Sequence, residues 1–206
     1  MKVEIKKIEP KDLVIVAKLL TQNFAKDKGV IVLFKKEDPK YIDKVNQWFI
    51  STLKMMINGK QNINIAFVEN KIVGVSIVTH SSFNPSIISL LKWTYSVLIT
   101  CGLTTVIESA KHDKNRKKSF TKRHQYILEF IAVDESYSGN GIGKQLSADL
   151  HELAKTKNTT VWLETTKANN IKIFNKMNYH LVKTKLELGV KYYIMTNEST
   201  EELKPI

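Results

Sequence analysis

The chain has 206 residues, of which 43% are hydrophobic and 25% charged, a composition typical of a globular domain that buries a full core. Its one cysteine, Cys101, excludes an internal disulfide and fits a reducing compartment. The 32 Lys and Arg outnumber the 20 Asp and Glu, and this net charge of +12 favours anionic ligands such as phosphates, nucleic acid or acidic membranes.

The first third of the chain predicts one strand, two helices and a hairpin. Residues 3–8 alternate like a strand and contain no apolar signal-peptide core, so we expect a cytoplasmic protein. Helices are expected from Pro10 to Phe24 and from about Pro39 to Asn58, with a variable loop between them. Two runs rich in β-branched residues then predict the two strands of a hairpin, at 63–68 and 72–78.

A long insert follows, at about residues 81–124. Residues 87–107 are mostly apolar, but Lys92 and Gly102 argue against a membrane span, so we expect a helix pair packed over the open side of the sheet and no membrane partner. The basic block Lys111–Lys118, continued by 122–124, is expected to be a solvated loop. It has no interleaved aromatic residues, so no nucleic-acid partner is expected.

The most informative segment is a strand that leads through a glycine loop into a helix. An apolar run at 127–133 and a polar turn precede three glycines on alternate positions, Gly139, Gly141 and Gly143. The first N–H groups of a helix lack internal partners, and glycines let a phosphate approach them closely. The segment therefore predicts a phosphate-binding loop.

The spacing of the glycines distinguishes between phosphate ligands. A P-loop requires Ser or Thr after Gly-Lys, but Gln145 follows Lys144, and Ser138 stands where the leading glycine should be. A dinucleotide fingerprint requires its third glycine one residue later than Gly143. The P-loop interpretation therefore fails at two positions, and the spacing of the glycines disfavours the dinucleotide interpretation.

A second segment follows the loop helix. Residues 160–166 read as a strand containing Leu-Glu-Thr, and 169–180 read as a short helix that ends in a turn. Residues 182–185 and 191–195 suggest a last antiparallel pair, and 198–206 a frayed tail.

Together these two segments resemble the motifs of the GNAT superfamily of N-acetyltransferases, most closely its puromycin N-acetyltransferase-like branch. Ser138, Gly141 and Gly143 occupy the positions of [RQ]-x-x-G-x-[GA], with Ser138 departing from the pattern. Leu163-Glu164-Thr165 and Asn170 match the second motif, in which Phe174 replaces the usual Tyr. The resemblance implies an α/β (α+β) fold: one domain over residues 1–197, a mixed sheet of six to seven strands, and the helical insert between strands three and four.

The resemblance also implies acetyl-CoA as co-substrate, no metal, and direct transfer of the acetyl group to an amine of a small molecule or protein. The residues expected to bind coenzyme A are Ile131, Ala132, Val133, Ser138, Gly139, Asn140, Gly141, Ile142, Gly143, Lys144, Asn170 and Phe174.

The candidate catalytic residues are Glu129 and Tyr179. Strand alternation places Glu129 on the face of Ile131 and Val133, where an apolar setting suits a general base. Glu164 is the alternative base. Phe174 has no proton for the leaving thiolate, and Tyr179, Tyr137 or a water is the substitute donor.

The acceptor pocket is expected in the insert, with Phe83, Trp93, Tyr95 and Leu98 as lining residues or plain core. The acceptor is not identified, although the net positive charge hints at a neutral or anionic one. Two other functions stay open, a non-catalytic acetyl-CoA sensor and a basic nucleic-acid or membrane-surface protein. The sequence also leaves a homodimer open.

Overall fold

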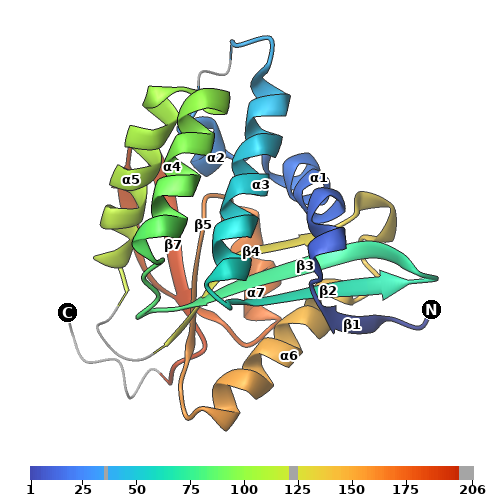
Figure 1. Ribbon diagram of the computed structural model, residues 1–206. Coiled ribbons are helices and arrows are strands. Elements are labelled where there is room, and N and C mark those ends of the chain that lie inside the picture. The colour runs from blue at the N-terminus through green and yellow to red at the C-terminus, as the bar shows by residue number, and fades with distance from the viewer. Residues whose placement is uncertain (35–36, 121–124, 200–206) are drawn as a thin grey trace.

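The computed structural model describes residues 1–34, 37–120 and 125–199, and they form one mixed sheet covered by helices on both faces (Figure 1). The helices and strands follow in chain order: β1 Glu4–Lys7, α1 Leu13–Phe24, α2 Lys28–Ile31, α3 Tyr41–Asn58, β2 Asn62–Val68, β3 Lys71–His80, α4 Ile87–Cys101, α5 Leu103–Lys117, β4 Tyr126–Val133, α6 Ile142–Thr156, β5 Val161–Thr165, α7 Ala168–Asn175, β6 His180–Glu187 and β7 Val190–Thr196.

The seven strands lie in the order β1-β2-β3-β4-β5-β7-β6. Every neighbouring pair is antiparallel except β4 and β5, which are parallel and joined by the crossover helix α6. The expected mixed sheet of six to seven strands is therefore confirmed, and so is the helical insert between the third and fourth strands.

The two faces of the sheet carry separate cores. Figure 1 shows α1, α3, α4 and α5 together on one face, with α6 against the other. The larger core joins α1 and α3 to the sheet and contains Phe49, Leu53 and Ile65, all nearly inaccessible to solvent. A smaller core under α6 and α7 contains Leu150, Leu163 and Phe174. Both cores form because the sheet residues alternate between the faces.

Three expectations are wrong in detail. The variable loop after α1 contains the short helix α2, whose first turn is capped by the Asp27 carboxylate accepting from Gly29 N at 2.9 Å. Residues Lys111–Lys117 lie on helix α5 and not in a solvated loop; residues 122–124 lie outside the described residues. The tail does not fray directly after Asn197, because Glu198 is buried and accepts a hydrogen bond from Trp162 Nε1 at 3.2 Å.

Candidate functional site: a glycine loop, a gap in the sheet and an aromatic cavity

The glycine loop connects β4 to α6 as expected. Gly139 and Gly141 have φ of 79° and 77°, left-handed values that L-residues rarely adopt, and Gly141 is the N-cap of α6. The first bond within the helix runs from Gln145 N to Gly141 O, so the N–H groups of Ile142, Gly143 and Lys144 have no partner inside the helix. These N–H groups at the positive end of the helix dipole suit an anion such as a pyrophosphate.

The other residues of the loop have different roles. Asn140 donates from Nδ2 to the carbonyls of Tyr137 and Ser138, at 3.1 and 3.4 Å, and so shapes the turn. The side chain of Ser138 is exposed. A Cβ on Gly143 would lie 3.7 Å from Met177 Cε and 3.8 Å from Val133 Cγ2, which are ordinary contacts. The protein interior therefore does not require glycine at position 143.

A gap opens in the sheet beside this loop. β4 pairs with β5 only from Tyr126 to Leu128, although β4 continues to Val133. Asp134 N donates to Val73 O at 2.8 Å. In an antiparallel pair only every second residue bonds to the neighbouring strand, so the residues of β4 that bond to β3 alternate with residues that do not. The backbone groups of Ile131 and Val133 therefore point away from β3, toward the side where β5 has diverged.

A β-bulge at Glu129 changes the direction of the side chains of β4. Ile77 pairs with Phe130 while its neighbour Val78 pairs with Leu128, so Glu129 is the extra residue. After the bulge, Ile131 and Val133 pack on the α6 face, whereas Glu129 points to the α5 face. The expectation that Glu129 shares a face with Ile131 and Val133 is wrong, because the inserted residue reverses the alternation.

Glu129 is held by an ion pair with Arg116 of α5. Arg116 Nη2 donates to Glu129 Oε1 at 2.9 Å, Nη1 contacts Oε2, and the hydroxyl of Thr79 donates to Oε1. Burial by itself lowers the pKa of the Arg116 guanidinium, but the Glu129 charge outweighs it and raises that pKa, so Arg116 stays charged. Sequence reasoning missed Arg116, one of only two arginines in a lysine-rich chain, and that rarity was the available signal.

A second buried charge cluster lies around Glu164 of β5. Its carboxylate contacts His112 Nε2 at 3.3 Å and Lys185 Nζ at 3.1 Å, and Glu187 contacts the same two partners at 3.1 and 3.0 Å. Burial alone raises the pKa of the Glu164 carboxyl, but His112, Arg116 and Lys185 together hold it below its ordinary value. Glu164 is therefore a tightly paired carboxylate.

A cavity of about 640 Å³ lies between the helical layer and the sheet, and it reaches the gap beside β4 at Ile131 and Asn170. This volume is typical of a small-molecule site. Of the expected pocket residues, Phe83 and Trp93 line the cavity. Tyr95 and Leu98 do not line it: Tyr95 is 68% exposed and Leu98 41% exposed, on the outer side of α4.

Phe174 and Tyr179 lie in the core between α6 and α7 and do not line this cavity. The Tyr179 ring contacts Phe174 and His151, and its hydroxyl accepts from Ser147 at 3.5 Å. Burial raises the pKa of Tyr179 to about 12, so its hydroxyl stays protonated at neutral pH.

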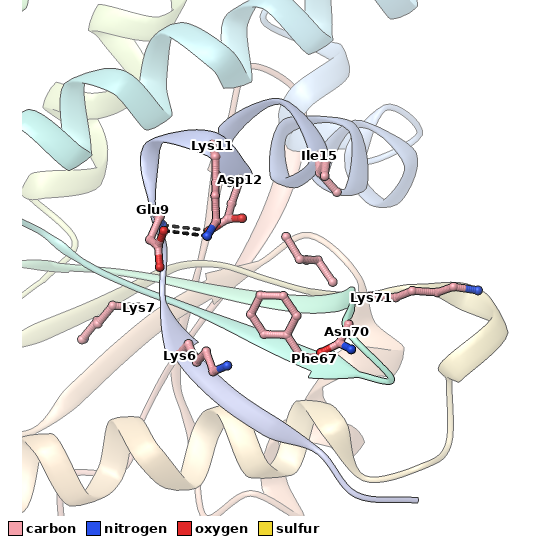
Figure 2. A pocket seen from close by; sticks show the side chains of 10 residues that line it. Lys6, Lys7, Glu9, Lys11, Asp12, Ile15, Phe67, Asn70 and Lys71 are labelled. Atoms are coloured by element: carbon pink, nitrogen blue, oxygen red, sulfur yellow. Dashed lines mark hydrogen bonds and ion pairs between the residues drawn. The ribbon is translucent and has the colours of Figure 1, made fainter.

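A second pocket, of about 650 Å³, lies at the β1 edge of the sheet (Figure 2). Its lysines include Lys6, Lys7 and Lys71, and Figure 2 shows their side chains pointing in different directions. The pocket therefore lacks a convergent set of groups that would bind one ligand.

The mixed sheet, with its glycine loop between β4 and α6, has the architecture expected of the GNAT superfamily, and comparison with known proteins shows the family. The model of the acetyltransferase (GNAT) family matches residues 31–179, and the chain belongs to that family. No curated protein matches the chain.

Solved structures share the fold at low identity. The chain is similar to a structure described as histone acetyltransferase HPA2 and related acetyltransferase, from Corynebacterium glutamicum, with a TM-score of 0.70, 16% identity and 96% of both chains covered. It is also similar to the PaiA N-acetyltransferase of Thermoplasma acidophilum in complex with coenzyme A, with a TM-score of 0.61, 14% identity, and 97% and 100% of the two chains covered.

A third similar structure is a mosquito arylalkylamine N-acetyltransferase-like protein, with a TM-score of 0.55, 13% identity, and 95% and 99% of the chains covered. In the part of the chain that the structure describes, no cluster of side chains suits a metal ion. The described helices also include none with the length and apolar character needed to cross a bilayer.

Proposed function

We propose that the protein is an acetyl-CoA-dependent N-acetyltransferase that acts on a small amine bound in the aromatic cavity. The observation that carries this proposal is the continuity of three features: the glycine loop, the gap between β4 and β5, and the cavity that opens beside Ile131. The puromycin N-acetyltransferase-like branch stays a prediction.

The residues around the gap fit coenzyme A. The N–H groups of Ile142, Gly143 and Lys144 would hold the pyrophosphate, and nothing lies within 4 Å of a Cβ position on Gly139 or Gly141 to obstruct it. The backbone of Ile131 and Val133 would pair with the pantetheine arm in place of the absent β5 strand. Acetyl-CoA supplies the thioester that an amine attacks.

The acyl-transfer step requires a polarised carbonyl and a neutral amine. In this proposal the backbone N–H of Ile131, which points away from β3 into the gap, polarises the carbonyl. We propose Glu129 as the proton acceptor, reached through the Thr79 hydroxyl, which lines the cavity and donates to Glu129. Arg116 fixes the orientation of Glu129. Glu164 suits this role less, because two basic side chains, His112 and Lys185, bind it, whereas Glu129 is paired with Arg116 and also contacts the cavity-lining Thr79 hydroxyl.

The leaving thiolate has no tyrosine at position 174 to protonate it. A free thiol has a pKa of about 8.5, so the thiolate leaves without an acid, at some cost in rate. Tyr179 retains its proton but lies in the core, so in this proposal water protonates the thiolate.

The test is acetyl-CoA binding by calorimetry on wild type, Gly141→Glu and Gly189→Glu. Gly189 also has positive φ (73°) with nothing within 4 Å of its Cβ position, but it lies in the β6–β7 turn. The Gly189→Glu variant therefore introduces the same backbone strain and the same negative charge away from the glycine loop. We expect Gly141→Glu alone to abolish binding. Absence of binding in wild type would refute the proposal.

A second candidate function is an acetyl-CoA sensor without catalysis, and Phe174 in place of tyrosine favours it. The two candidates differ in turnover. The enzyme releases coenzyme A only when a suitable amine is added, whereas the sensor binds acetyl-CoA and releases none with any amine.

A further inference from the structure

The carboxylates that line the cavity differ in how well their charge is neutralised. Glu129 has Arg116 at 2.9 Å, Glu164 has Lys185 at 3.1 Å, and Asp113 has Lys117 at 2.9 Å. Asp27 differs from these three. Among the described residues its nearest cation is Lys167 Nζ at 4.0 Å, whose side chain is 53% exposed.

Asp27 is nevertheless rigidly held. Its Oδ1 accepts from Gly29 N at 2.9 Å, both carboxylate oxygens accept from the Thr166 hydroxyl at 2.9 Å, and only 12% of its side chain is exposed. Phe24, at the end of α1, packs its ring 5.2 Å from that of Phe130 on β4. This contact brings the α1–α2 connection, and Asp27 with it, to the gap in the sheet.

The hydroxyl of Tyr192 lies close to the same point. A Cβ placed on Gly29 would be 3.2 Å from Asp27 Oδ1 and 3.4 Å from the Tyr192 hydroxyl. Tyr192 is 2% exposed and lines the cavity, and its hydroxyl has no hydrogen-bond partner among the described residues. A buried hydroxyl without a partner is costly unless a ligand supplies one.

Aromatic side chains form part of the cavity wall, beside its polar and charged side chains. Trp48 Nε1 donates to Ser109 Oγ at 3.3 Å and Trp93 Nε1 donates to Thr52 Oγ1 at 3.1 Å, so these indoles present no free donor. Phe83, Phe24 and Phe130 also line the cavity. This aromatic part of the wall matches an aromatic or branched aliphatic body.

We infer that Asp27 and Tyr192 bind the ammonium group of the acetyl acceptor, and that the acceptor is a small primary amine on an apolar, preferably aromatic, body. This inference rests on the proposed function. The net positive charge of the chain had suggested a neutral or anionic acceptor, and this inference replaces that suggestion. A carboxylate inside the cavity attracts an ammonium group at contact distance, whereas solvent and salt screen the repulsion from surface charges.

The test measures amine binding without turnover, by calorimetry of 2-phenylethylamine in the presence of saturating coenzyme A. Phenylethanol lacks the ammonium group and spermidine lacks the apolar body, so they serve as matched ligands. The protein variants are Asp27→Asn, Tyr192→Phe and the control Asp149→Asn. Asparagine still accepts from Gly29 N and Thr166, so Asp27→Asn removes the charge and keeps the cap. Asp149 is exposed on α6, and its substitution makes the same change in net charge.

We expect 2-phenylethylamine to bind more tightly than either matched ligand. Asp27→Asn should weaken its binding about tenfold or more, since hydrogen bonds to charged groups are the strong ones. Tyr192→Phe should weaken it by a smaller factor, and Asp149→Asn should not change it.

Three results would overturn the inference: equal binding of phenylethanol, tighter binding of spermidine, or unchanged affinity in Asp27→Asn. Coenzyme A binding is measured in the same samples. Its absence would refute the proposed function, whereas coenzyme A binding without amine selectivity would refute only the ammonium site.

Discussion

Arg116 on α5 and Glu129 at the bulge of β4 form a two-armed ion pair that links the helical insert to the sheet. The insert and the strand meet through this pair at the wall of the cavity. The ion pair therefore has a structural role as well as a place in the proposed site.

Replacement of Arg116 by Met should destabilise the protein by about 3–5 kcal/mol, because it leaves a buried carboxylate without its counter-charge. The double variant Arg116→Met/Glu129→Leu should be more stable than Arg116→Met, since it removes the orphaned charge too. Urea denaturation measures both, and a double variant that is the less stable of the two would contradict this interpretation.

The two glycines at the start of α6 should respond differently to alanine. Gly141→Ala forces a side chain into left-handed backbone and should cost about 1–2 kcal/mol. Gly143→Ala should change stability by less than about 0.5 kcal/mol, because its Cβ makes only ordinary contacts. Thermal unfolding of the two variants checks the prediction, and equal costs would refute the φ argument.

The Glu164 cluster predicts a pH dependence of stability. The pKa of Glu164 is lowered in the folded protein from an ordinary value of 4.5, so its stabilising contribution is present above 4.5 and is lost as pH falls through the lower folded value. Glu164→Gln should therefore be less stable than wild type at pH 7, and this difference should shrink in acid. Unfolding curves recorded between neutral and acid pH test this, and a difference that grows in acid would contradict it.

Alanine substitutions of Trp93 and Tyr95 should have different effects on stability and on acceptor binding, although both residues lie on α4. Trp93→Ala removes a cavity wall and the hydrogen bond to Thr52, and should cost up to about 3 kcal/mol and weaken acceptor binding. Tyr95→Ala should leave stability within about 0.5 kcal/mol and acceptor affinity unchanged, because the side chain is exposed. Denaturation and acceptor titration measure the two effects; a loss of affinity in Tyr95→Ala would place it in the pocket after all.

Local patterns predicted most of the elements. The periodicity of residues 39–58 and the hairpin pattern at 63–78 indicated α3, β2 and β3. Burial of one side of a helix or strand requires apolar residues at regular intervals in the sequence. The helical phase also separates Trp93 from Tyr95: residues two apart lie about 200° apart around a helix, so one cavity cannot receive both.

The sequence by itself determined the strand, the glycine loop and the helix at 127–156, since left-handed turns and helix starts depend on neighbouring residues. The tertiary structure alone decided the direction of Glu129, because a bulge exists only in the pairing of β4 with β3. It also decided the burial of Arg116 and the position of both Asp27 and Tyr192 beside Gly29. These arrangements bring together segments that are far apart in the chain, and a local pattern does not specify which distant group a side chain will lie near.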